Sequence, residues 1–533
     1  MLLKKQSSGG DNAEKCRSIR PVTVAHSLTA PSTMPTPGAA GLSHDAEAGR
    51  LAIPVLLYLA SVMLPIGFAV GPLFLSDLRV LLLIMVVPLT FRMLAGAYGG
   101  ILATDILFLL YVTWATLALA VNNPDRVIQN AGSTGLEFIG GYVLARAYIR
   151  NVHQFATLSR YMVYMVTCTL PFALVEMVTG HPIIIELLQK VPFLVPSAVP
   201  ALSDPRFGLT RVQVVFAHPI HYGLFCTIAF SLCFVGMKGL MGDSRRIGLA
   251  LISAFCATLS LSSGALLAVL LQIMLIGWAW VFRSVRTRWL VLLGLLAFTY
   301  LAIDLLSNRT PYKVFLTYAT FSSGTAYWRS LILDWGLFNV GQHPIFGIGL
   351  NDWVRAPFMY SPSIDNFWLI VAMRYGVPAF AFIVSGYVWA LWRIGLRDFD
   401  TDPMIWQYRR AWMFSFVGLS FTLVTVDVWS TMYSFVFFIF GSGMWFLTAT
   451  PGEGAVVATE TPDPRALRLR RAFSVTPVWA RLAAPLAFRR APETRPVPAP
   501  AQPNATAAMR RPAPRYTRFP PGGDGPGPGE RSR

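Results

Sequence analysis

The sequence predicts an all-α polytopic membrane protein with about 12 transmembrane helices, and three observations lead to this fold class. Apolar residues make up 54% of the 533 residues and charged residues only 13%, whereas charged residues are about 25% of soluble proteins. The apolar residues come in blocks of about 20, the length that crosses a bilayer as a helix. Arginines and lysines lie mostly between these blocks and in the tails.

The composition divides the chain into three parts. Residues 1–50 are rich in Ser, Thr, Pro and Ala, and residues 451–533 contain 16 prolines and 14 arginines. We expect both tails to be disordered and cytoplasmic, because neither can bury an apolar core. Between Arg465 and Arg490, arginines mix with apolar residues, and two interpretations stay open, a segment on an anionic membrane surface or a solvated linker.

Residues 51–450 are expected to form the transmembrane domain, with a long outer loop, 307–365, before the tenth helix. The twelve predicted spans are 51–70, 78–96, 102–121, 130–149, 161–180, 214–236, 246–262, 264–282, 289–306, 366–392, 411–428 and 431–449.

Basic residues predict the orientation of these spans. Four loops rich in Arg or Lys, near 146–160, 238–246, 283–288 and 393–410, fall on the same side as both tails, which the positive-inside rule makes cytoplasmic. The opposite, outer side carries two long segments, 181–213 and 307–365, which contain four arginines despite the rule: Arg206, Arg211, Arg329 and Arg355. These arginines indicate that positive charge has a function at the outer face. The alternative is that long loops cross the membrane regardless of their charge.

Several kinds of function lack support in the sequence. The net charge of +18 would indicate a nucleic-acid partner in a soluble protein, but membrane orientation accounts for it here. No Walker loop, HExxH or GxSxG motif is present. The five cysteines show neither metal-ligand spacing nor a disulfide framework, and the outer acids are widely spread. We therefore expect neither a metal nor a cofactor.

The first candidate feature combines two arginines and two histidines at the mouth of the sixth span. Arg206 and Arg211 precede His218 and His221, a set that can bind a phosphate and move a proton. The alternative is that the histidines only cap a helix that starts at Pro219.

The second and third features lie at the end of the seventh span and in the long outer loop. Ser262 and Ser263 can contact a polar ligand, although Ser and Gly also serve ordinary helix packing. Arg329 lies in an apolar, aromatic stretch and needs an anionic partner, either a ligand phosphate or an acid such as Asp334. His343 begins a His-Pro-Ile-Phe-Gly-Ile-Gly segment shortly after it.

The fourth feature is Asp365-Asn366, where the outer loop meets the tenth span. A carboxylate there can act as a general base or hold a sugar hydroxyl, and the amide adds a donor and an acceptor. Asp and Asn also favour the N-cap of a helix, and both roles are compatible.

These motifs, in this order, resemble the O-antigen ligase and polysaccharide polymerase superfamily. The resemblance covers about 55–450 and rests on Arg211 with the His218 segment, the Ser-Ser-Gly-Ala turn, Arg329, the His343 segment and Asp365-Asn-Phe-Trp-Leu. It implies a glycosyltransferase at the outer face of the bacterial inner membrane. Such a protein moves a glycan from undecaprenyl diphosphate to an acceptor glycan or a lipid-linked glycan, for O-antigen or exopolysaccharide, with other assembly proteins as possible partners.

The resemblance implies roles for the candidate residues. Catalysis falls to Asp365 or His218 as the base and to Arg329. Substrate binding falls to Arg206, Arg211, His221, Ser262, Ser263, His343 and Asn366. Family members often have Ser-Arg-Gly and His-Asn where this chain has Ser262-Ser263-Gly264 and Asp365-Asn366, which favours a polymerase or a ligase-like relative over a ligase of the lipid A core. The alternative from another class is a 12-helix transporter or flippase.

Overall fold

The computed structural model describes residues 49–450, apart from 71–72, 193, 202–204 and 320–322. Both predicted tails therefore lie outside the described residues, except for residues 49 and 50. The described elements are mainly helices, joined by short turns and by three short strands.

Seven helical segments are long and apolar enough to cross a membrane, which confirms a multi-pass helical membrane protein. They are α4 (Ala103–Asn122), α7 (Val152–Thr179), α9 with η3 (Pro219–Ser231 and Leu232–Gly236), α11 (Ser263–Val281), α12 (Arg288–Leu306), α15 (Phe367–Leu396) and α17 with η4 (Ser430–Gly441 and Met444–Leu447). Four other predicted spans overlap α3 (Asp77–Leu94), α5–η2–α6 (Val127–Asn130, Ala131–Gly135 and Leu136–Tyr148), α10 (Asp243–Leu259) and α16 (Pro403–Leu423). Twelve spans therefore stay a prediction.

The first predicted span, 51–70, is wrong over its last third. Helix α2 (Ile53–Met63) ends early because Leu64 precedes Pro65, which disfavours the helical backbone, and Leu64 is extended. The chain continues as β1 (Ile66–Val70), which pairs antiparallel with β2 (Leu73–Ser76) and β3 (Val195–Pro196). An 11-residue helix followed by a strand is too short to cross a bilayer in the expected way.

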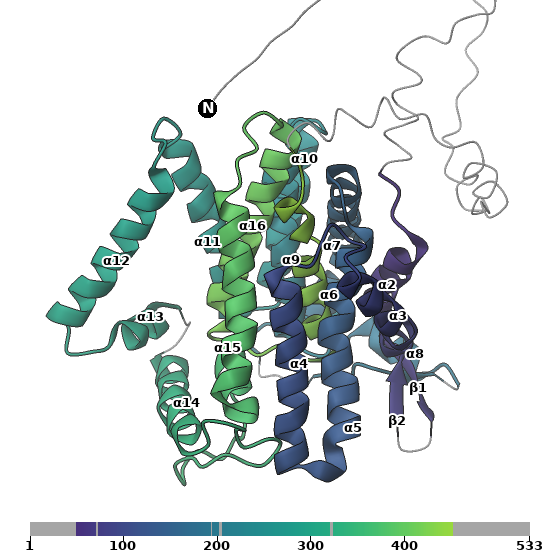
Figure 1. The fold of residues 1–533 in the computed structure, drawn as a ribbon, viewed down its shortest axis with the longest axis vertical. Coiled ribbons are helices and arrows are strands. Elements are labelled where there is room, and N and C mark those ends of the chain that lie inside the picture. Colours follow the sequence, from purple (N-terminus) through teal and green to yellow (C-terminus); the bar gives the residue numbers. More distant parts are fainter. Residues whose placement is uncertain (1–48, 71–72, 193, 202–204, 320–322, 451–533) are drawn as a thin grey trace, which may run out of the picture. The chain divides into compact units, whose positions relative to one another are not determined.

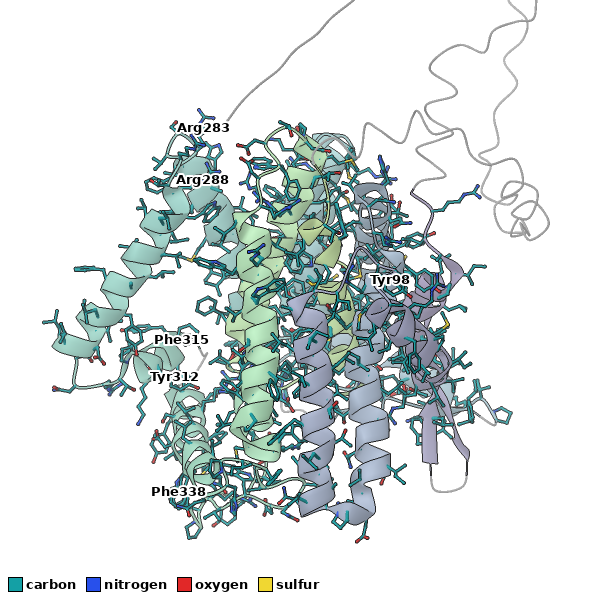
Figure 2. The ribbon with its side chains drawn as sticks, viewed as in Figure 1. Tyr98, Arg283, Arg288, Tyr312, Phe315 and Phe338 are labelled. Atoms are coloured by element: carbon teal, nitrogen blue, oxygen red, sulfur yellow. The ribbon has the colours of Figure 1, made fainter. Side chains whose placement is uncertain are left out.

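The long outer segment 307–365 contains two helices rather than an extended loop. These are α13 (Pro311–Ala319) and α14 (Ser323–Gln342). A short helix, α8 (Ile183–Gln189), lies in the other long segment, and η1 (Pro124–Arg126) follows α4. Figure 2 shows Arg283 and Arg288, at the turn between α11 and α12, at the opposite end of the described helices from Phe338 of α14.

Helix α15 is broken at Gly376, where the backbone has φ 83° and ψ 173°. Its first half, Phe367–Tyr375, folds back beside the second half. The ring of Trp368 in the first half and that of Tyr387 in the second have their centroids 5.4 Å apart. The second half lies along α4 (Figure 1). Nine residues of helix span about 13 Å. The residues just before Phe367 are thus carried inward from the end of α4 by up to that distance.

Helices α6 and α17 pack closely in the aromatic centre of the bundle. A Cβ on Gly141 would lie 2.5 Å from the carbonyl oxygen of Ser434, so only glycine allows this approach. The rings of Phe108, Phe138 and Phe437 meet beside this contact, with centroids 4.3–5.7 Å apart.

We therefore expect Gly141→Ala to destabilise the folded protein by about 1–3 kcal/mol, because the added methyl group forces α6 and α17 apart. Thermal unfolding of the detergent-solubilised protein measures this. Gly248→Ala on α10 is the matched control, since a Cβ there meets no atom within 4 Å. An equal melting temperature for the two variants contradicts the prediction.

Candidate active site

The first two candidate features meet in the structure. The guanidinium of Arg206 donates from Nη1 to the carbonyl oxygen of Leu261 at 2.8 Å, and that of Arg211 donates from Nε to the carbonyl oxygen of Ser260 at 3.4 Å. Both arginines thus hold the turn between α10 and α11. Leu261 adopts a positive φ of 45°, a strained backbone that such packing has to maintain.

Glu176, at the end of α7, fixes the loop that carries these arginines. Its carboxylate accepts the backbone N–H of Gln213 at 2.8 Å and of Val214 at 2.9 Å. Val214 also has a positive φ, 54°. Sequence reasoning missed this residue, although an acid inside an apolar span is a signal of a polar task.

We expect Glu176→Gln to weaken the loop rather than the chemistry itself, because an amide can accept only one of the two N–H groups with its oxygen. Limited proteolysis should show faster cleavage within 205–217, with at least a several-fold change in rate. Glu186→Gln on α8 is the control, because that carboxylate pairs with His181 instead. Unchanged cleavage in Glu176→Gln would show that the carboxylate does not hold the loop.

Ser262 has a structural role in the turn. It is the N-cap of α11, and its Oγ accepts the backbone N–H of Ala265 at 3.5 Å. Ser262 and Ser263 are both buried. They lie directly beside the arginine contacts, at the start of the helix.

His218 is the N-cap of α9, as the alternative interpretation predicted. Its Nδ1 accepts the backbone N–H of Ile220 at 3.2 Å. Burial and the nearby charge of Arg211 lower the pKa of His218 to about 4, against the opposing charge of Asp365. The imidazole is therefore neutral near pH 7. With Nδ1 accepting, the proton of the neutral ring is on Nε2, which can donate a hydrogen bond. The role of His218 as a base stays a prediction.

His221 lies one turn further into α9 and is 1% exposed. Its ring packs 4.0 Å from that of Trp429, and its Nε2 has no hydrogen-bond partner within the described residues.

Arg329 on α14 is the least satisfied cation of this group. It is 9% exposed, and its Nε and Nη1 find no hydrogen-bond partner in the part of the chain that the structure describes. Burial lowers the pKa of Arg329, and the charge of Arg206 acts in the same direction, while Asp365 and Tyr312 oppose the shift. A buried guanidinium with open donors favours an anionic partner.

Asp365 and Asn366 lie at the start of the inward half of α15. Asn366 caps the helix, with Oδ1 accepting the backbone N–H of Leu369 at 3.0 Å, and its side chain also bonds to Tyr312 of α13. Asp365 is half-buried, accepts the hydroxyl of Ser363 at 3.1 Å, and interacts electrostatically with both His218 and Arg329. The carboxylate therefore acts electrostatically on both His218 and Arg329.

Three helices thus begin in one neighbourhood. Their N-caps are His218 of α9, Ser262 of α11 and Asn366 of α15. Helix N-termini carry partial positive charge and free N–H groups. Together with Arg206, Arg211 and Arg329 they make this region strongly favourable for an anion.

Sequence reasoning did not identify two further residues of this region, Tyr312 and Asp427. Burial raises the pKa of Tyr312, and its hydrogen bond to Asn366 opposes the rise. Asp427 lies between α16 and α17, and the backbone N–H of Phe367 bonds to the carbonyl oxygen of its neighbour Val426 at 3.1 Å. Asp427 is the only charged residue in 411–452, a signal that could have identified it.

Burial raises the pKa of Asp427 to about 7, partly offset by Arg374 and reinforced by Asp365. The folded protein thus holds a proton that the unfolded chain releases at lower pH, so stability falls as the pH rises from about 4 to about 7. We expect Asp427→Asn to raise the melting temperature at pH 8 and to have little effect near pH 4. Asp125→Asn, at an exposed position, serves as the control, and an unchanged melting temperature at pH 8 contradicts the prediction.

His343 is not part of this cluster. It is exposed, and the segment that follows it covers the break in α15: the N–H of Val377 bonds to the oxygen of Pro344 at 2.7 Å, and that of Ile348 to Met373 at 2.8 Å. The motif that follows His343 thus has a structural role at this break, and the substrate-binding role of His343 stays a prediction.

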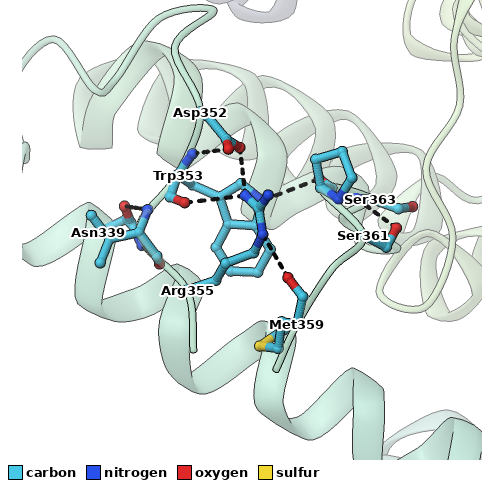
Figure 3. A network of polar contacts seen from close by, with 9 residues as sticks. Asn339, Asp352, Trp353, Arg355, Met359, Ser361 and Ser363 are labelled. Carbon is cyan, nitrogen blue, oxygen red and sulfur yellow. Dashed lines mark hydrogen bonds and ion pairs between the residues drawn. The ribbon is translucent and has the colours of Figure 1, made fainter. Parts of the chain in front are cut away.

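Arg355, the fourth outer arginine, is used within its own loop (Figure 3). Its Nη1 pairs with Asp352 at 2.5 Å and its Nε donates to the carbonyl oxygen of Met359 at 2.9 Å. Asn339 ties the same loop to α14 through the backbone of Val354. The charge of Arg355 is thus balanced by Asp352 within the loop.

The segment that carries both Arg329 and Asp365 matches a known family. Residues 248–384 match the family model described as O-antigen ligase. The resemblance to the O-antigen ligase and polymerase superfamily is confirmed. The ligase-family segment contains Ser262, Arg329 and Asp365, whereas Arg211 and Asp427 lie outside it. No curated protein matches the chain.

Proposed function

We propose that this protein transfers a glycan from a polyprenyl diphosphate carrier to an acceptor glycan at the outer face of a bacterial inner membrane. The ligase-family match supports a membrane glycan ligase or polymerase. The observation that carries the proposal is Arg329, which is buried beside Asp365 with two open nitrogen donors.

We assign the diphosphate of the donor to the region around Arg206, Arg211 and Arg329. Arg329 supplies open N–H donors, and Arg206 and Arg211 bond to the turn before α11. Three helices, α9, α11 and α15, begin in the same region. A planar guanidinium can bind phosphate oxygens with two parallel hydrogen bonds. The carrier itself is proposed to be undecaprenyl diphosphate.

The reaction needs no metal in this scheme. The acceptor hydroxyl oxygen attacks the anomeric carbon of the donor sugar and forms the new glycosidic bond. The bond from that carbon to the phosphate oxygen breaks, and its electron pair leaves with the diphosphate, where the arginines stabilise the negative charge. Asp365 takes the hydroxyl proton, because neutral His218 already uses its Nδ1 lone pair. Attack from the face opposite the diphosphate inverts the configuration.

Orientation follows the basic loops. Arg283 and Arg288 lie at the opposite end of the described helices from α14 (Figure 2), so placing them in the cytoplasm puts Asp365 toward the outer leaflet. We also propose that both termini are cytoplasmic. The departures from the family motifs favour polymerisation of repeat units, for exopolysaccharide or O-antigen, over transfer to the lipid A core.

Deletion of the gene in the native host tests the proposal. We expect long polysaccharide to disappear and single repeat units to accumulate on the lipid carrier. The wild-type gene and the exposed-site variant Arg309→Ala should both restore the polymer. Polymer of normal length stranded on the carrier would identify a ligase instead, whereas unchanged polysaccharide would contradict both activities and favour a transporter.

A further inference from the structure

Two arginines meet at the end of the described helices that lies away from the candidate active site. Arg288 is the first residue of α12, and Arg410 lies about two turns into α16. Figure 2 shows Arg288 at the opposite end of the described helices from Phe338 of α14. This pair is therefore separate from the arginines that we assign to the diphosphate.

Aromatic rings connect the two arginines. The guanidinium of Arg410 lies over Trp406, 4.2 Å from the ring centroid, and 5.6 Å from the centroid of Phe414. The ring of Phe414 is 5.7 Å from that of Trp289, and the guanidinium of Arg288 is 5.9 Å from the same tryptophan ring. These contacts bring the two guanidinium groups, from α12 and α16, into one neighbourhood.

The charges of this pair are not balanced within the part of the chain that the structure describes. Neither Arg288 nor Arg410 forms an ion pair there. Burial and the charges of Arg288 and Arg409 lower the pKa of Arg410 to about 10, so it stays charged near pH 7 while its neighbours repel it. Burial also lowers the pKa of Arg409, but there the charges of Asp398 and Asp400 oppose the shift.

Both arginines have open donors. The Nε atoms of Arg288 and Arg410 are shielded from solvent and have no hydrogen-bond partner among the described residues. Nη1 of Arg288 donates to the carbonyl oxygen of Arg283 at 3.2 Å, and the indole of Trp278 donates to the carbonyl oxygen of Arg288 at 3.0 Å. These bonds hold Arg288 at the turn and leave its Nε open. Buried cationic donors without acceptors favour an anion with several oxygens, such as a phosphate.

The surroundings of the pair match the level of lipid headgroups. Tryptophans collect at membrane–water interfaces, and exposed or half-buried tryptophans are found at this end: Trp278, Trp280, Trp289 and Trp406. No residue of α12 is buried against the described protein, and Figure 1 shows this helix diverging from α15 and α16. Apolar side chains such as Leu290 and Leu293 are therefore open to acyl chains beside the arginines.

We propose that Arg288 and Arg410 bind the phosphate of an anionic phospholipid whose acyl chains lie along α12. The positive-inside rule places this end, and hence the lipid, at the inner leaflet. Zwitterionic phospholipids carry a cation next to their phosphate, which the two arginines repel. Charge complementarity therefore selects a headgroup with a net negative charge. This lipid site does not depend on the proposed glycan transfer.

Lipid-dependent thermal unfolding of the purified full-length protein in neutral detergent tests the site. The probes are dioleoylphosphatidylglycerol, zwitterionic dioleoylphosphatidylcholine and glycerol phosphate, which offers the same phosphate without acyl chains. The dependence of the melting temperature on probe concentration gives an apparent Kd. The variants are Arg288→Gln and Arg410→Gln. Arg393→Gln is the matched control, because it removes an exposed cation that lies over Trp389 of α15.

We expect at least about tenfold weaker binding of phosphatidylglycerol in Arg288→Gln and in Arg410→Gln, the usual effect of losing a charged hydrogen-bond donor. Arg393→Gln should stay within about twofold of the wild type, and phosphatidylcholine should bind the wild type at least about tenfold more weakly than phosphatidylglycerol.

Two results overturn the proposal. One is wild-type affinity for phosphatidylglycerol in a folded Arg288→Gln, which decides alone if Arg410→Gln does not fold. The other is equal affinity of the wild type for the two lipids. Glycerol phosphate that binds as tightly as phosphatidylglycerol also contradicts a lipid site, because it assigns the arginines to a soluble phosphate.

Discussion

Arg329→Ala should lower the rate of glycan transfer by about two to three orders of magnitude, the usual effect of removing one donor that stabilises developing negative charge. Arg329 is buried, two of its nitrogen atoms lack partners within the described residues, and Asp365 is its main opposing charge. Membranes containing the variant, supplied with lipid-linked repeat units from the deletion strain, give the rate through the release of carrier diphosphate.

The same variant should be at least as stable as the wild type. A buried guanidinium with open donors beside Arg206 costs folding free energy, and its removal relieves that cost. Arg329→Lys keeps a charge but loses the planar fork, so we expect partial activity. Arg309→Ala controls for the loss of an exposed arginine. A fully active Arg329→Ala, or one that is inactive only because it unfolds, contradicts the assignment.

Asp365→Asn should reduce the maximal rate by about 10²–10⁴, the range for loss of a general base. The change keeps the size of the side chain and leaves Asn366 as the cap of α15. We therefore expect the KM for the lipid-linked donor to change little. Rates at several donor concentrations separate the two parameters.

Asp352→Asn is the matched control, because Asp352 lies in the same segment but pairs with Arg355 at the surface. His218→Asn keeps a short polar cap for α9, and it should lower the rate less than Asp365→Asn does. A larger loss in His218→Asn, with Asp365→Asn active, would move the base to the histidine and contradict the tautomer argued above.

The helical blocks and part of the site could be predicted because both depend on local chemistry. Twenty apolar residues must form a helix in a bilayer, and α4, α11 and α12 match their predicted spans within one residue at each end. The cluster of Arg206, Arg211 and Asp365 was foreseen from polar residues at the ends of spans.

The rest depends on contacts that a linear pattern does not contain. Hydropathy predicts one span over 366–392, because it does not detect the reversal at Gly376. At that reversal Val377 donates its N–H to the oxygen of Pro344, and Ile348 donates its N–H to the oxygen of Met373. Tyr312 and Asp427 join the site only through tertiary packing. The carboxylate of Asp427 is isolated in sequence, and its partners Arg374 and Asp365 come from another helix.

The aromatic packing of α17 has a consequence for the membrane as a barrier. Phe437, Phe438 and Phe440 are fully buried, and Phe440 stacks on Tyr387 and lies against Trp412. These rings fill the space between α15, α16 and α17. We therefore expect this part of the described helices to exclude water and to leave protons and ions no path through it, which proton flux into proteoliposomes would measure.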